Sequence, residues 1–203
     1  MSRFKKPDVE AVYEFLREQK ALIVHFSGTP PAGCGKFHFP ADLRNVLNFG
    51  AMNGLSCSLV KPGDNFDGER GPRNAYGSVG VILALTDKES LVTATAGDGG
   101  SMCVNGVREF DERDLDIQKV RDSLLKRVEA NEWGIRNYKT IGIFIADPIQ
   151  VNTPSLPSPN VNEEFVRTAF PDQRIFSFSG TEIVEILSNG QWRIVNPAEL
   201  YSL

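Results

Sequence analysis

The sequence predicts one α+β domain, and three observations support that fold class. Of the 203 residues, 41% are hydrophobic, which is enough for one substantial core. Apolar runs typical of strands are interleaved with amphipathic segments typical of helices, without the regular strand–helix repeat of a doubly wound sheet. Clusters of glycine and proline separate these runs. We therefore expect residues 1–203 to form a single α+β domain.

Three segments carry apolar residues at helical spacing. The first follows Pro7 and Asp8, a pair that suits the start of a helix. The longest has its apolar stripe at Ile117, Val120 and Leu124. The predicted helices cover residues 8–19, 42–47 and 114–130.

Short runs rich in Val, Ile, Leu and Thr predict strands. One run has a second interpretation, because Asn162 followed by Glu163 and Glu164 is also typical of a helix start, with an amide cap and acids in the first turn. The predicted strands cover residues 21–26, 55–60, 78–85, 91–96, 140–146, 164–168, 174–178, 182–187 and 191–195.

Two long loops separate the first predicted strands. Residues 27–39 contain three glycines and two prolines, and residues 61–77 contain four glycines, two prolines and six charged side chains. Loops of this length and composition are often functional. We expect the segment from Lys61 to Gly77 to be a surface lid that closes over a ligand.

Charge and cysteine content argue against several classes of protein. With 22 basic and 26 acidic residues the net charge is −4, whereas a non-specific duplex binder needs clustered cations. No apolar run is long enough to span a membrane, and the N-terminus leads into a charged amphipathic segment, so we expect a cytoplasmic protein with no membrane partner. Cys34, Cys57 and Cys103 are odd in number and widely spaced, which favours reduced thiols.

Two ligand-binding motifs are incomplete. The first Gly/Pro loop follows a predicted strand as a phosphate-binding loop does, but Pro30 replaces a required glycine and Phe37 replaces the hydroxyl residue that holds magnesium. His25, Cys34 and His38 would supply three zinc ligands, yet their spacing matches no closed four-ligand site. We therefore predict neither a nucleoside triphosphate site in this loop nor a metal site.

Two short blocks of sequence resemble the DarT-type ADP-ribosyltransferases. In the first, His25 ends a predicted strand and is followed by Phe26 and Ser27, then by a short predicted helix and a Gly-Leu pair. That family has a strand ending in His-Phe-Thr, a helix with an Asn-Leu-x-x-Ile-Leu pattern and a Gly-Leu pair. Asp42 stands at the family's asparagine. The second block, residues 163–166, is similar to the family's Ala-Glu-Phe-Leu-Val segment, whose glutamate is catalytic.

This resemblance implies an ADP-ribosyltransferase-like fold, with short antiparallel sheets around a cleft and helices at its flanks. NAD would be the substrate, and Glu164 would support the oxocarbenium-like ribose that develops as nicotinamide leaves. Glu164 or its neighbour Glu163 would take a proton from the acceptor. We therefore predict that His25 and Glu164 line one cleft, although nearly 140 residues separate them.

The remaining predicted site residues would hold NAD. His25 would bond the adenosine-side ribose, Ser27 a ribose or an amide, and an arginine the pyrophosphate through its planar fork. Tyr76 would stack on nicotinamide. Each residue also has a structural interpretation, as a buried histidine, a solvated loop arginine or a core tyrosine. The predicted NAD-binding residues are His25, Phe26, Ser27, Asp42, Arg70, Arg73 and Tyr76.

The leading functional hypothesis is an NAD-dependent mono-ADP-ribosyltransferase that modifies a protein or a nucleic-acid base in single-stranded DNA or RNA. Such an enzyme would act as a toxin or in phage–host conflict, and a cognate antitoxin would then be a partner. One alternative is a non-catalytic α+β binding module, antitoxin-like or a phage accessory protein. Another is a hydrolase that uses Cys34 and a histidine. Affinity for NAD separates the first hypothesis from the others.

Overall fold

The computed structural model describes residues 6–26, 40–49, 55–64, 79–97, 103–104, 107–108, 115–127, 131–146 and 163–202. The helices in these ranges are α1 (Val9–Gln19), α2 (Ala41–Phe49), α3 (Ile117–Leu125), α4 (Glu163–Ala169) and α5 (Pro197–Leu200). The strands are β1 (Leu22–Phe26), β2 (Leu55–Val60), β3 (Val79–Leu85), β4 (Leu91–Thr95), β5 (Cys103–Val104), β6 (Val107–Arg108), β7 (Glu132–Ile135), β8 (Tyr138–Ile145), β9 (Ile175–Ser179), β10 (Glu182–Ile186) and β11 (Trp192–Ile194). The predicted α+β class is confirmed.

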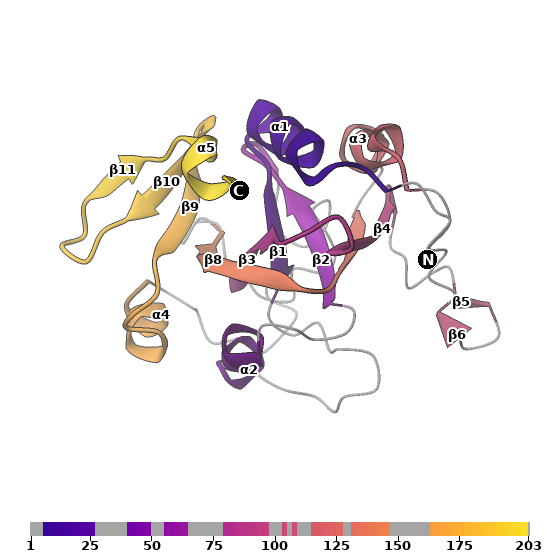
Figure 1. Cartoon of the computed structure of the whole chain (residues 1–203). Coiled ribbons are helices and arrows are strands. Elements are labelled where there is room, and N and C mark those ends of the chain that lie inside the picture. Colours follow the sequence, from indigo (N-terminus) through magenta and orange to yellow (C-terminus); the bar gives the residue numbers. More distant parts are fainter. Residues whose placement is uncertain are drawn as a thin grey trace.

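One large mixed sheet organises the chain (Figure 1). Its nine strands follow the order β11-β10-β9-β8-β3-β1-β2-β7-β4, and β5 and β6 form a separate two-stranded sheet. In the large sheet, β8 and β9 are parallel and the other neighbours are antiparallel. The short antiparallel sheets implied by the family resemblance are therefore replaced by one continuous sheet, because β2 joins β1 to β7 and β8 joins β3 to β9.

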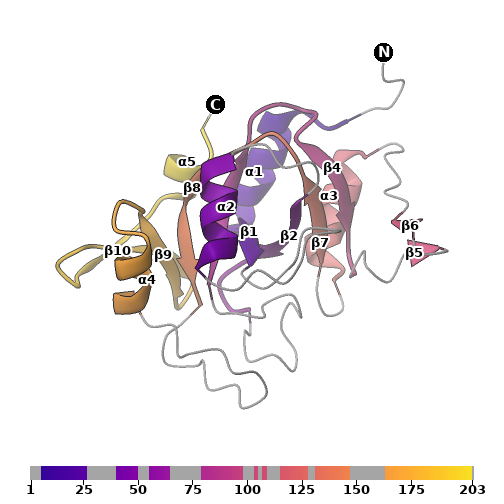
Figure 2. The same ribbon diagram turned by 90° about the horizontal axis from the view of Figure 1, so that it is seen from below.

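Helices cover both faces of the sheet. In Figure 1, α1, α3 and α5 lie above the sheet and α2 and α4 below it, and Figure 2 shows α2 in front of the central strands. The helices of the upper layer are tied together through α1. Arg17 donates two hydrogen bonds, of 3.0 and 2.8 Å, to the carbonyl oxygen of Tyr201 just after α5, and Arg121 of α3 lies 5.1 Å from the Phe15 ring centre.

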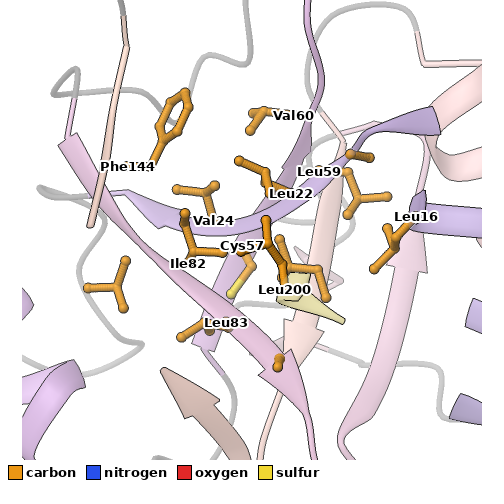
Figure 3. Packing of buried hydrophobic residues seen from close by; sticks show 14 of the residues in the cluster. Leu16, Leu22, Val24, Cys57, Leu59, Val60, Ile82, Leu83, Phe144 and Leu200 are labelled. Atoms are coloured by element: carbon orange, nitrogen blue, oxygen red, sulfur yellow. The ribbon is translucent and has the colours of Figure 1, made fainter. Parts of the chain in front are cut away.

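The core lies around the central strands β1 and β3, in which every residue is buried. A strand covered on both faces has a continuous apolar sequence rather than an alternating one. This explains why both strands are recognisable as short apolar runs. Figure 3 shows the packing at this point, with Val24 of β1 close to Ile82, its register partner on β3.

α1 forms as its sequence predicts. The Asp8 side chain accepts a hydrogen bond from the Glu10 backbone N–H and caps the start of the helix. At the other end Lys20 adopts a left-handed conformation, with φ 50°, and its N–H returns to the last turn. Between these caps, one face is apolar and buried.

Residues 164–168 are helical, so the predicted strand is wrong and the helix-start interpretation is correct. Val166 and Phe170, which are four residues apart, are buried, whereas Glu164 and Phe165 are exposed. Glu163 and Arg167 form an ion pair of 2.7 Å one turn apart. The run is too short for its apolar period to be distinguished from that of a strand.

Two further predictions need correction. The predicted helix over 114–130 is shorter, because the Asp116 side chain caps its start and helical structure ends at Leu125. β7 is absent from the predicted strands. Its four residues include a glutamate and a glycine, which are depleted in strands, and they are extended because β2 and β4 pair with both of their edges.

Candidate functional site

Two of the predicted NAD contacts, His25 and Phe26, end β1 and are buried, with exposures of 2% and 1%. Successive strand residues point to opposite faces. The Phe26 ring meets the Phe144 ring edge-on, at 6.1 Å and 83°. The Nδ1 atom of His25 lies 2.8 Å from the carbonyl oxygen of Ser56. Because a carbonyl oxygen only accepts, Nδ1 carries the proton in this contact.

The His25 contact crosses a point where the sheet splits. β1 pairs with β2 from Leu22 to Val24, whereas His25 and Phe26 pair with β3. Residues 55–57 of β2 pair with β7, which lies along the opposite edge of β2. Figure 1 shows β1 and β2 side by side near α1 and apart at their other ends. The imidazole ring therefore spans a position where the backbone ladder between the described parts of β1 and β2 has ended.

Gly80 on β3 holds the backbone close to this split. A Cβ atom at this position would lie 2.4 Å from Cγ1 of Val24 and 2.7 Å from the carbonyl oxygen of His25. Real side chains do not tolerate such distances, and neither a strand backbone nor a branched valine moves easily. The glycine is thus required for β3 to approach the end of β1, which fixes the backbone that carries His25.

The ends of four neighbouring strands lie on the same side of the sheet, near His25. Register pairs join Phe26 at the end of β1 to Gly80 near the start of β3, and Gly80 to Phe144 near the end of β8. β2 begins on this side too, since it is antiparallel to β1. In the sequence, the predicted NAD contacts fall at and just beyond these ends, in His25 and Phe26 of β1 and in the segment before β3. This side of the sheet is the candidate functional site.

Several predicted NAD contacts belong to segments that lie outside the described residues. These contacts are Ser27, Arg70, Arg73 and Tyr76, and the side chain of Asp42, whose backbone lies in α2. Most of the predicted lid, from residue 65 to Gly77, lies outside them as well. Its first turn is anchored, because Asp64 accepts a hydrogen bond from the Lys61 N–H and forms an ion pair with Arg127. These assignments remain predictions.

The two predicted catalytic carboxylates lie in the first turn of α4. Glu163 is paired with Arg167, which also donates to the carbonyl oxygens of Ile186 and Leu187 at the end of β10, each at 2.8 Å. Glu164 is exposed to solvent. β10 is four positions from β1 in the sheet order, roughly 19 Å at ~4.8 Å per strand. A cleft lined by both His25 and Glu164 would have to extend past several strands, and it stays a prediction.

α4 and α2 are nevertheless neighbours below the sheet. Arg44 of α2 donates a 3.3 Å hydrogen bond to the carbonyl oxygen of Ala169 at the end of α4, and its guanidinium lies 6.0 Å from the ring centre of Phe170. On its other side, α2 accepts a hydrogen bond at the Val46 carbonyl from the hydroxyl of Tyr138 on β8. α2 therefore connects the layer carrying the glutamates to the central strands.

Sequence reasoning missed a buried carboxylate beside the split. Glu132, the first residue of β7, is 3% exposed. The β2–β7 register pairs Cys57 with Trp133, and the Asn131 side chain exchanges hydrogen bonds of 2.7 and 3.1 Å with the Leu59 backbone. Continuing the register between these points places Glu132 next to Ser58. β2 thus has His25 bonded to it from one side and Glu132 beside it on the other.

The residues of β2 around this point are polar but buried. Ser58 is 1% exposed, and its hydroxyl oxygen makes no hydrogen bond within the part of the chain that the structure describes. Burial raises the pKa of the Cys57 thiol, and the negative charge of Glu132 raises it further. The thiol is therefore protonated and a poor nucleophile. The Ser-Cys-Ser run inside a predicted strand was the available signal for a polar site in the core.

Within the described ranges, no group of three His, Cys, Asp or Glu side chains could hold a metal ion, and no helix is long and apolar enough to cross a membrane. Comparison of the chain with protein-family models, curated proteins and solved structures finds no match. The function is therefore inferred from the site and the sequence blocks alone.

Proposed function

We propose that the protein is an NAD-dependent mono-ADP-ribosyltransferase that modifies a protein or a base of single-stranded DNA or RNA. The observation that carries the proposal is the place of His25. It ends a central strand where the sheet splits, with its ring fixed by the Ser56 carbonyl oxygen. His25 and Phe26, the described residues of the first block of the family resemblance, are thus buried and paired within the sheet.

His25 suits the recognition of a ribose. The Ser56 carbonyl oxygen engages Nδ1 and so sets the orientation of the imidazole, a group that can form hydrogen bonds with the hydroxyl groups of a sugar. Burial and the hydrogen bond to Ser56 hold the His25 ring in one orientation, so little side-chain entropy is lost on binding. The resemblance assigns this histidine to the adenosine-side ribose of NAD.

Transfer requires a carboxylate near the reacting ribose. The nicotinamide–ribose C–N bond breaks and its electron pair leaves with nicotinamide, while an acceptor nucleophile bonds to the ribose carbon and releases its proton to a base. A negative charge opposite the oxocarbenium-like carbon lowers the barrier. Glu164 has this role by resemblance, and Glu163 is a candidate base. Glu132 is a second candidate for the charge, because it is buried and separated from β1 only by β2.

The first test is NAD turnover by the purified full chain. Incubation with NAD labelled in its adenylate half should release nicotinamide and transfer label to protein, single-stranded DNA or RNA. Binding of NAD should be measurable by calorimetry even when the correct acceptor is missing. A well-folded chain with neither NAD binding nor nicotinamide release would refute the proposal.

A matched pair of substitutions isolates His25. The amide nitrogen of His25→Asn can replace Nδ1 as the donor to Ser56, but nothing replaces Nε2. His25→Gln extends further and reproduces Nε2 better than Nδ1. We expect His25→Asn to keep the fold and to weaken NAD binding about 10-fold or more, as the loss of one ligand hydrogen bond predicts. Unchanged affinity in a folded His25→Asn protein would remove His25 from the site.

Three carboxamide variants identify the carboxylate. The variant at the catalytic position should keep NAD binding and lose about 10²–10³ in turnover. Glu164→Gln is the prediction from the sequence, Glu132→Gln is suggested by the fold, and Glu163→Gln reports on the acceptor base, since it should reduce transfer while NAD hydrolysis persists. Glu185→Gln is the control, because the Glu185 carboxylate on β10 is already held by ion pairs with Arg174 and Arg193. Wild-type turnover in all three test variants would contradict carboxylate catalysis by these residues.

A non-catalytic binding module is the second candidate function. It is favoured by one observation, the exposed Trp192 and Ile194 on the terminal strand β11, each 59% exposed. Exposed apolar side chains on a sheet edge are typical of interaction surfaces. Absence of NAD binding together with stable association at this strand would favour this function.

A further inference from the structure

β11 combines exposed apolar side chains with an outer edge that no other described strand pairs with. It is the last strand of the large sheet, and all three of its residues are exposed. At the opposite edge, the β4 backbone is partly covered, since the Lys6 ammonium group donates a 3.3 Å hydrogen bond to the carbonyl oxygen of Leu91. Natural edge strands usually carry charges or prolines that discourage pairing. β11 instead presents Trp192 and Ile194 on one face.

The hydrogen-bond pattern shows which backbone groups of β11 point outward. The Leu187 N–H donates to the Gln191 carbonyl at 2.7 Å, and the Val195 N–H donates to the Ile183 carbonyl at 2.9 Å. Hydrogen-bonded pairs alternate along an antiparallel ladder, so Arg193 also directs its N–H and C=O toward β10. The corresponding groups of Trp192 and Ile194 therefore point away from the sheet.

We propose that β11 pairs with β11 of a second copy of this chain, antiparallel about a two-fold axis through Arg193. In this register Trp192 faces Ile194 of the other copy, and the outward groups of both residues form reciprocal hydrogen bonds. The same face then carries two aromatic–β-branched cross-strand pairs, a favourable combination. One three-residue strand thus supplies both halves of a self-complementary edge.

Charge on the opposite face is compatible with this arrangement. Arg193 would lie opposite its own copy, which is unfavourable for a bare cation. However, its guanidinium is already bound to Glu185 at 2.7 Å and to Glu199 at 3.0 Å, and Arg174 shares Glu185 at 2.8 Å. The two arginines and two glutamates of this cluster have a net charge of zero. Two such clusters can therefore meet without net repulsion, and each arginine approaches carboxylates of the other copy.

The interface is small, so dimerisation should depend on concentration. Two three-residue strands and their side chains bury less than the ~1,200 Å² of a standard stable interface. Sedimentation velocity of the full chain should show a shift from monomer toward dimer as concentration rises. A chain that stays monomeric at the highest soluble concentration would overturn the proposal.

Two variants test strand pairing against simple apolar stickiness. Trp192→Lys places a charge on the apolar face, and Ile194→Pro removes an outward N–H that β10 does not use. Both should abolish the dimer while circular dichroism and melting temperature stay close to wild type. Leu125→Lys is the matched control, since Leu125 is 55% exposed on α3, and it should dimerise normally. A dimer that survives Ile194→Pro in folded protein would exclude pairing through β11.

A disulfide tests the register. Residues opposite one another in a non-hydrogen-bonded pair have Cα atoms about 4.5 Å apart, within the range that a disulfide spans. Arg193→Cys should therefore form a covalent dimer on mild oxidation. Ser188→Cys, in the turn before β11, should not, and the wild-type chain controls for the native cysteines. Equal crosslinking at positions 188 and 193 would contradict the proposed axis.

Discussion

The two ends of β1 are held in different ways. At Leu22 and Ile23 the strand pairs with β2, Ile23 also pairs with β3, and the Ile23 N–H donates a 3.0 Å hydrogen bond to the Tyr201 hydroxyl. At His25 and Phe26 the backbone pairs with β3, and a side chain makes the contact to β2. The first end fixes the strand in the core. At the second end, the contact to β2 is made by a buried polar side chain in place of backbone pairing.

This contrast predicts that substitutions at the first end change stability alone, whereas those at the second end also change ligand binding. The proposed ribose contact of His25 also requires rigid packing around the split, because a binding side chain has to be held in a fixed orientation. Substitutions at Gly80 and Tyr201 test the comparison directly, and those at Glu185, Glu163 and Glu164 set it against regions away from β1.

The largest effect on stability should come from Gly80→Ala, at the split. The added methyl group would meet Val24 and the His25 backbone at 2.4 and 2.7 Å, so β3 must move away from β1. We expect a loss of about 3 kcal/mol in the free energy of unfolding, measured by urea denaturation. Gly97→Ala is the control, since a Cβ there has no neighbour within 4 Å. Equal stability of the two variants would show that the strands are not closely held.

Tyr201→Phe should be the next most damaging, and it tests the other end of β1. Removal of the hydroxyl leaves the buried Ile23 N–H without its acceptor, a cost of about 2 kcal/mol. NAD affinity, once measured, should not change. Tyr13→Phe is a close control, because that hydroxyl is a donor to the Leu85 carbonyl, and a carbonyl that loses one donor costs less than an orphaned buried N–H. A folded Tyr201→Phe protein with impaired NAD binding would break the distinction between the two ends.

The ion-pair cluster of Glu185, Glu199, Arg174 and Arg193 predicts a moderate dependence of stability on pH. Hydrogen bonds from Arg174, followed by the charges of Arg174 and Arg193, lower the pKa of Glu185. A lowered pKa in the folded state contributes stability above the ordinary pKa of 4.5, and this contribution is lost as pH falls through the folded-state value. The stability difference between wild type and Glu185→Gln, about 1–2 kcal/mol near neutral pH, should therefore shrink below about pH 4. A constant difference would indicate that the cluster is not electrostatic.

The smallest effects on stability are expected at the start of α4. Glu163→Gln removes an ion pair and a favourable charge near the helix N-terminus, which together contribute about 0.5 kcal/mol. Glu164→Gln should change stability even less, because its side chain is exposed. Thermal melts of both variants should overlay wild type closely. Any large loss of turnover at either position would then be chemical rather than structural.

Local sequence patterns were sufficient for most of the fold. Leu55–Val60 was predicted at its observed bounds, and α1 within one residue, because apolar residues alternating with serines in one and a capped amphipathic stripe in the other are both local signals. β7 was not predicted, and the sequence left both a strand and a helix open for α4, for a shared reason. Each is shorter than the period needed to identify it, and its structure depends on partners distant in sequence, β2 and β4 for one and Arg167 contacts with β10 for the other.

The sequence by itself determined the α+β class, the position of His25 at a strand end and the placement of Glu163 and Glu164 after a proline-rich break. Only the tertiary structure decided that the strands share one sheet, that the sheet splits beside His25 and that Glu132 is buried across β2. The physical reason is that local propensity acts over a few residues. Strand order, splits and burial of a charged side chain are set by contacts between segments far apart in the chain.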